Sequence, residues 1–109
     1  MSNYLFIESR DPFESADTKF VEQSAAALRQ RGHNVTVFLV QNGVLASRRT
    51  AGKTYLDKLA DARVTLLADN FSLQERGIQN GELRAGIQPS TIEALVDALL
   101  QENTKAIWH

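Results

Sequence analysis

Three loops in this sequence carry side chains that could hold a small ligand, and each loop follows an apolar run. The runs cover residues 4–7, 35–40 and 64–68. The loops contribute Ser9, Arg10, Asp11, Gln41, Asn42, Gly43, Asp69, Asn70, Phe71 and Ser72. If the runs are parallel strands of one sheet, their carboxyl ends point the same way, and ligands of open α/β sheets usually bind there. We therefore predict that these ten residues form a ligand-binding crevice.

The same residues allow two other interpretations. Asp11, Asn42 and Asn70 could simply cap helices, because short polar side chains accept hydrogen bonds from free backbone N–H groups; this explanation has the same weight as a ligand pocket. In an enzymatic version Asp69 would act as a general acid or base, with Arg10 or Asn42 holding an anionic substrate. Partial burial at a strand end can raise the pKa of a carboxyl group toward neutrality, which is what such a role requires.

Cofactor and metal chemistry find little support in the sequence. The 109 residues include no cysteine, so a thiolate nucleophile, a disulfide and a thiolate-bound zinc or iron–sulfur centre are excluded. His33 and His109 are the two histidines, and we expect surface positions for both rather than a metal site. Gly52-Lys53-Thr54 ends like a phosphate-binding loop, but Ser47 stands where the leading glycine of that motif belongs. We expect no metal, no cofactor and no recognisable catalytic motif.

Charge and hydropathy narrow the classes of partner. Twelve Lys and Arg against thirteen Asp and Glu give a net charge of -1, which provides no field for a polyanion, so we expect no nucleic acid partner. No apolar run approaches the roughly 20 residues that span a bilayer, and no signal-peptide pattern is present. We therefore expect no membrane partner and a cytoplasmic location. A single domain over residues 1–109 can bury about two-thirds of its surface without a covalent staple.

The apolar pattern also predicts the fold that positions the loops. Tyr4–Ile7, Val35–Val40 and Val64–Ala68 are nearly continuous apolar runs rich in branched residues, as in buried parallel strands. Lys105–Trp108 and a brief strand at Ile87 bring the sheet to about five strands. Because helical segments separate these runs, we predict a flavodoxin-like three-layer α/β/α domain with a mainly parallel sheet.

Two helices are expected between the first three strands. The first ends at Arg31 before Gly32, starts either within residues 10–15 or after them, and turns Ala16, Phe20, Ala27 and Leu28 to one side. The second runs from about Lys53 to Ala60 after a short turn over residues 44–49, with Leu56, Leu59 and Ala60 facing inward.

Two further helices are expected after the third strand. A short one extends through Leu73 to Arg76, with Asp69 or Asn70 as its cap and Gly77 as its end. The last begins at a capping box over residues 90–93 and ends near Gln101. Its apolar positions are Ile92, Leu95, Val96, Leu99 and Leu100, and we expect Leu95 and Leu99 to be buried.

Four segments together resemble small members of the DsrE/DsrF-like family, which is related to sulfur-relay proteins. They are residues 4–14, 38–44, 66–78 and 107–109, and the most distinctive phrases are Asn42-Gly43-Val44 and Ser72-Leu73-x-x-Arg76-Gly77-Ile78. The resemblance covers nearly the whole chain and implies a DsrE-like fold. It also implies self-association, because family members are commonly homotrimers, homohexamers or hetero-oligomers.

The resemblance does not imply that this chain performs the sulfur chemistry of the family. In sulfur-carrying members a cysteine just after the third strand accepts sulfane sulfur as a persulfide. The matching position here is Ala68 or Asp69, and neither a methyl group nor a carboxylate can hold a persulfide.

Three hypotheses follow. The first is a non-catalytic DsrE-like subunit, a homotrimer or homohexamer that binds a small molecule or protein partner and is accessory to sulfur trafficking. The second is an enzyme that uses Asp69, and the third is a purely structural oligomer.

Overall fold

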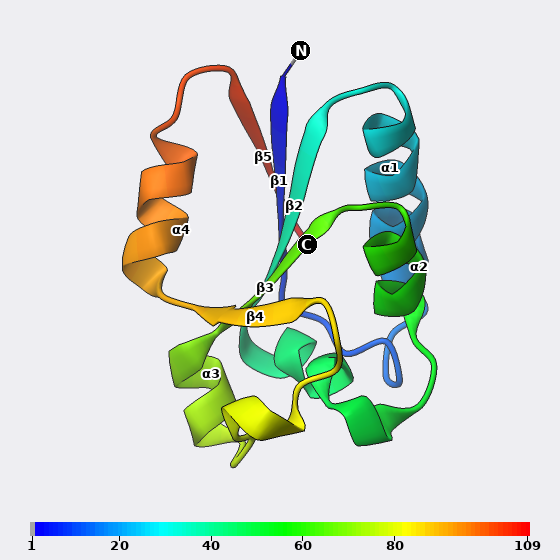
Figure 1. Cartoon of the computed structure of the whole chain (residues 1–109), viewed down its shortest axis with the longest axis vertical. Coiled ribbons are helices and arrows are strands. Elements are labelled where there is room, and N and C mark those ends of the chain that lie inside the picture. The colour runs from blue at the N-terminus through cyan, green and yellow to red at the C-terminus, as the bar shows by residue number, and fades with distance from the viewer. Residues whose placement is uncertain (1) are drawn as a thin grey trace.

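The three apolar runs and the two further predicted strands form one sheet in which every neighbouring pair of strands is parallel, in the order β4-β3-β2-β1-β5. A computed structural model describes residues 2–109 (Figure 1). The elements are β1 (Asn3–Glu8), α1 (Thr18–Gln30), β2 (Asn34–Leu39), the 3-10 helices η1 (Gln41–Ser47) and η2 (Arg49–Ala51), α2 (Tyr55–Asp61), β3 (Thr65–Asp69), α3 (Asn70–Glu75), the 3-10 helix η3 (Asn80–Glu82), β4 (Ile87–Ser90), α4 (Ile92–Leu99) and β5 (Thr104–Trp108). The predicted α/β fold is confirmed, and the four longer predicted strands each lie within one residue of the observed bounds.

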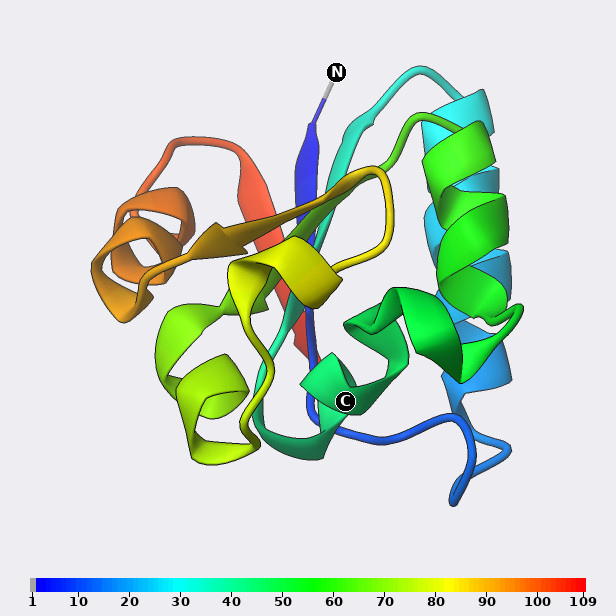
Figure 2. The same cartoon turned by 60° about the horizontal axis from the view of Figure 1, so that its bottom comes forward.

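Helices cover both faces of the sheet. α1 and α2 lie side by side on one face and α4 lies on the other, while α3 and η1 gather at the carboxyl ends of the strands (Figures 1 and 2). Within residues 2–109 no helix has both the length and the apolarity required to cross a bilayer.

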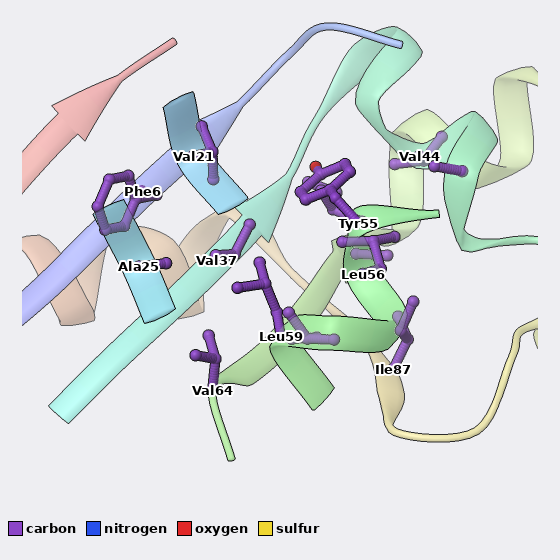
Figure 3. Close-up of a cluster of buried hydrophobic side chains, with 14 of the residues drawn as sticks. Phe6, Val21, Ala25, Val37, Val44, Tyr55, Leu56, Leu59, Val64 and Ile87 are labelled. Carbon is purple, nitrogen blue, oxygen red and sulfur yellow. The ribbon is translucent and has the colours of Figure 1, made fainter. Parts of the chain in front are cut away.

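The main hydrophobic core lies between the sheet and the α1/α2 layer. Phe6 and Val37 of the strands pack there with Val21 of α1 and with Leu56 and Leu59 of α2 (Figure 3). All five side chains are fully buried. The inward placement of Leu56 and Leu59 agrees with the prediction, although α2 begins at Tyr55 because Thr54 is its cap and accepts a hydrogen bond from Leu56 N at 3.2 Å.

α1 corrects the predicted helix phase. The helix begins at Thr18, so residues 10–15 form a loop, which is one of the two starts that the sequence allowed. Phe20 is 50% exposed instead of facing the core, whereas Val21 and Ala25 are fully buried. The ring of Phe20 packs beside the imidazole of His109, with 5.6 Å between the ring centres. The predicted inward stripe of Ala16, Phe20, Ala27 and Leu28 is therefore wrong, because the side of α1 that contacts the sheet is the one that contains Val21 and Ala25.

α4 covers a smaller core and corrects a second prediction. Leu95 is buried as expected, but Leu99 is 41% exposed. The helix is capped by Thr91, whose hydroxyl accepts from Ala94 N, and it ends at Leu99 rather than near Gln101. Ser90 cannot serve as the cap because it belongs to β4, where it pairs with Asp69 of β3.

Candidate functional site

A pocket of about 350 Å³ lies at the carboxyl ends of β2 and β3, on the α4 side of the sheet. Four of the ten predicted residues line it: Gln41, Asp69, Phe71 and Ser72. The other lining residues are Val40, Glu75, Ile92, Leu95 and Trp108. We call this pocket the crevice; Figure 2 shows the end of the sheet at which it lies. Its lining comes from η1, β3, α3, α4 and β5, so the fold itself positions it.

The hydroxyl of Ser72 joins two of the predicted loops inside the crevice. It donates to Asp69 Oδ2 at 2.7 Å and accepts from Gln41 N at 2.8 Å. Asp69 Oδ2 also accepts from Ser72 N at 3.0 Å, which makes Asp69 the cap of α3. The carboxylate of Asp69 therefore has a structural task, and of the two caps that the sequence allowed for this helix, Asp69 and Asn70, the structure has Asp69.

Three other predicted residues lie around the crevice. Asn42 Oδ1 accepts from Arg76 Nε at 3.2 Å and Nη2 at 3.0 Å, an additional tie between η1 and the end of α3. Asn70 lines a pocket of about 540 Å³ that follows the outer side of α3. Gly43 touches β1 so closely that a Cβ there would lie 2.3 Å from the carbonyl oxygen of Glu8.

The first loop does not line the crevice. Ser9 Oγ donates to the backbone oxygen of His109 at 3.2 Å. Arg10 forms an exposed ion pair with Asp17. Asp11 Oδ1 accepts from Phe13 N at 3.0 Å and closes a turn. The structure thus brings two of the three predicted loops together and assigns the third to local structure.

A buried carboxylate beside an imidazole was missed by the sequence analysis. Glu8 ends β1 with a fully buried side chain, and His109 Nδ1 lies 2.9 Å and 3.0 Å from its two carboxylate oxygens. His109 was expected at the surface, but its side chain is only 16% exposed. Burial raises the pKa of the Glu8 carboxyl group, while the hydrogen bond and charge of His109 act in the opposite direction.

Tyr55 adds a third buried group to this neighbourhood. Its hydroxyl oxygen is buried and has no hydrogen-bond partner among the described residues. Burial, and then the negative charges of Glu8 and Asp11, raise the pKa of Tyr55. Within residues 2–109 no three His, Asp or Glu side chains lie close enough to hold a metal ion. The arrangement is a buried carboxylate–imidazole contact with a buried tyrosine hydroxyl in its neighbourhood.

The signal for this pair was present but could not be interpreted from local sequence. Glu8, like Asp69, is a charged residue that closes an otherwise apolar run, and charged side chains are seldom fully buried unless they are paired. Its partner is known only once β5 is placed beside β1 with Ile7 opposite Trp108, which puts His109 next to Glu8.

Comparisons with known proteins agree on fold and family. A family model described as the DsrE/DsrF-like family matches residues 2–105. The crystal structure of the ychN protein from E. coli is similar to this chain with a TM-score of 0.88 and 19% identity, over 100% of both chains. The structure of MTH1491 from Methanobacterium thermoautotrophicum, a protein of unknown function, is similar with a TM-score of 0.80 and 17% identity, also over 100% of both chains. No curated protein sequence matches this chain.

Proposed function

The chain belongs to the DsrE/DsrF-like family, and from that premise we propose that it is a non-catalytic oligomeric subunit that binds a small ligand or protein partner in the crevice. The family is related to sulfur-relay proteins, and we place this chain in an accessory role without covalent sulfur transfer. A cytoplasmic location belongs to the same proposal.

The observation that carries the proposal is the role of Asp69. Of the two positions where the family's sulfur carriers would have their cysteine, Ala68 is fully buried in the core while Asp69 lines the crevice. Asp69 therefore matches the place of a reactive cysteine better. Its carboxylate caps α3 and cannot hold a persulfide. In this proposal the crevice is the counterpart of the family's pocket, and a carboxylate stands where the sulfur carriers have their cysteine.

The same contacts weigh against an acid–base role for Asp69. One carboxylate oxygen already accepts two hydrogen bonds, from the backbone N–H and the hydroxyl of Ser72. That oxygen is therefore engaged in capping α3 and is not free to exchange a proton with a bound substrate. Arg10 and Asn42, which the enzymatic version assigned to an anionic substrate, are bonded to Asp17 and Arg76.

Sulfur labelling tests the proposal. The protein is incubated with a cysteine desulfurase and ³⁵S-cysteine, then denatured and washed. We expect no label on the chain, because it contains no thiol. The matched control is Asp69→Cys, which places a thiol at the crevice and should acquire label that a reductant releases. Stable label on the unaltered chain would contradict the proposal.

The outer surface of α4 supports the oligomeric part of the proposal. Val96, Leu99 and Leu100 have exposed side chains on or directly after this helix, and none of them lines the crevice. Contiguous apolar side chains of this kind on a soluble protein usually mark a contact with another protein. We propose that this surface, which we call the α4 face, joins subunits into a trimer or a hexamer.

Light scattering tests the assembly. We expect a mass of three or six times 12.1 kDa at micromolar concentration. Val96→Lys should shift the mass toward a single chain, because a buried interface cannot accommodate an unpaired ammonium group. The matched control is Phe13→Lys, an equally drastic change of an exposed apolar side chain in the loop before α1, and it should leave the mass unchanged. A mass near 12 kDa for the unaltered protein would refute the oligomer.

A further inference from the structure

The crevice has a neighbour that extends it along the surface. A second pocket of about 290 Å³ is lined by Asp69, Phe71 and Ile92, which also line the crevice, and by Asn70, Gln74, Thr91 and Glu93. Phe71 and Ile92 therefore stand between two adjoining hollows. A ligand in the crevice can reach past them toward Glu93.

All the charged side chains that line these two pockets are negative. They are Asp69 and Glu75 in the crevice and Glu93 in the adjoining pocket. Arg76 forms an ion pair with one of them, since its Nη1 lies 3.9 Å from Glu75 Oε1. Its guanidinium is also bonded within the protein, because Nε and Nη2 donate to Asn42 Oδ1 and Nη1 donates to Ser72 O at 3.1 Å, so Asp69 and Glu93 are the lining carboxylates without an ion pair to it.

The helix N-termini beside these pockets carry acceptors of their own. The N-terminal N–H groups of α3 and α4 border these pockets, but each helix is capped by its own side chain. Ser72 N donates to Asp69 Oδ2, and Ala94 N donates to Thr91 Oγ1 at 3.1 Å. The first turn of α4 also contains Glu93, which offsets the positive end of the helix dipole.

The walls of the crevice suit an apolar body that carries a positive charge. Phe71 and Trp108 line it with side chains that are 63% and 64% exposed, and Val40 and Leu95 form a buried apolar base. Aromatic faces attract organic cations through their quadrupole, and nearby carboxylates add to that attraction.

We propose that the crevice binds a small organic cation, an apolar or aromatic body bearing an ammonium or guanidinium group, and disfavours anions such as sulfonates or persulfide anions. This inference rests on the proposed binding function and names its ligand class. A volume of about 350 Å³ matches a small molecule, since ligand pockets begin at about 300 Å³.

The test compares three probes that share one ring system and differ in charge. They are 1-naphthylmethylamine, which is protonated at pH 7, the neutral 1-naphthalenemethanol, and 1-naphthoate. Titration calorimetry on the assembled protein gives each affinity. NMR locates the binding, because the chain has a single tryptophan and Trp108 therefore gives a single indole N–H signal.

We expect the ammonium probe to bind about tenfold or more tightly than the carboxylate probe, with the alcohol between them, and to shift the indole signal. Replacing Glu75 and Glu93 by Gln should reduce that preference to about threefold or less. The matched control is Glu102→Gln, an exposed carboxylate in the turn before β5, and it should leave the preference unchanged.

Two outcomes would overturn the inference. In one, naphthoate binds as tightly as the amine or more so; binding of the alcohol at the crevice would then still support a ligand-binding subunit. In the other, no probe shifts the indole signal, and the crevice is not a site for this ligand class. Sulfur labelling and light scattering decide the proposed function separately.

Discussion

Removing the His109 imidazole should destabilise the protein at neutral pH far more than at pH 5. In His109→Ala the fully buried Glu8 carboxylate loses its partner and must either remain charged in the core or take up a proton. Proton uptake is the less costly course. It makes the stability of the variant depend on pH.

The size of this effect follows from proton linkage. Each pH unit above the ordinary Glu8 pKa of 4.5 adds about 1.4 kcal/mol to the free energy needed to protonate this carboxylate. Because the variant can always protonate Glu8, the stability that it loses is at most about 3.4 kcal/mol at pH 7 and about 0.7 kcal/mol at pH 5. The sign is that of a carboxyl group with a raised folded-state pKa. The contribution of the protonated Glu8 carboxyl group to the free energy of unfolding is fully present below pH 4.5 and is lost as the pH rises through the folded-state pKa. Because Glu8 already has a raised pKa beside His109, we expect a difference from the unaltered protein of about 1 to 3 kcal/mol at pH 7.

Urea unfolding followed by circular dichroism at pH 5, 6 and 7, at one protein concentration, measures this difference. Adding Glu8→Gln to His109→Ala should abolish its pH dependence, since an amide does not titrate. His33→Ala is the matched control, because His33 Nδ1 accepts from Ser2 N rather than contacting a carboxylate. A loss that is equal at pH 5 and pH 7, or one that Glu8→Gln leaves unchanged, would refute the reasoning.

Three further predictions concern packing and capping, and each is measured by urea unfolding. In the Val96→Lys background, in which we expect separate chains, Leu95→Ala should cost about 2 to 5 kcal/mol because the side chain is buried under α4, whereas Leu99→Ala should cost under about 1 kcal/mol, and equal losses would mean that the helix is rotated. Gly43→Ala should destabilise the fold by about 2 kcal/mol or more, since its Cβ would lie 2.3 Å from a backbone carbonyl oxygen of β1. Gly81→Ala, where a Cβ has nothing within 4 Å, is its control, and similar losses for the two would contradict the close approach. Asp69→Ala should cost about 1 kcal/mol through loss of the α3 cap while leaving the mass in light scattering unchanged; a change of mass would show that this residue contributes to assembly.

The sequence predicts the elements of this fold well where one local signal determines them. Continuous branched apolar runs can only be buried strands here, so their bounds agree to within one residue. The short helix α3 was predicted with its end at Gly77, whose φ of 67° is the left-handed conformation that glycine adopts without strain. Its cap at Asp69 follows from the same local rules.

Which side of a helix faces the core is harder to predict. Apolar residues surround most of α4, so spacing alone cannot distinguish a buried Leu95 from an exposed Leu99. In α1 the large Phe20 suggested the inner side, but the sheet leaves room there only for Val21 and Ala25. Sheet geometry decides both cases, and no local pattern encodes it.

The candidate site also contains some residues that local sequence predicts and others that depend on how the strands pair. Gln41, Asp69 and Ser72 could be predicted together because each lies just after a strand. Glu8 and His109 could not, since 101 positions separate them and only the register of β5 beside β1 joins them. Trp108 lines the crevice because of the same register of β5 beside β1.

The unequal covering of the two sheet faces has a consequence for motion. On one face the core draws on α1, α2, η1 and four strands, whereas the cluster under α4 contains only Leu5, Ile7, Phe38, Val40 and Leu95. Regions with few buried apolar contacts open at a lower free energy than the global transition. The amide protons of α4 should therefore exchange with solvent through partial unfolding of this helix, whereas those of α2 should exchange only when the whole domain unfolds. Subunit contacts on α4 would slow that exchange, so the exchange rates of the same amides would measure the stability of the subunit interface.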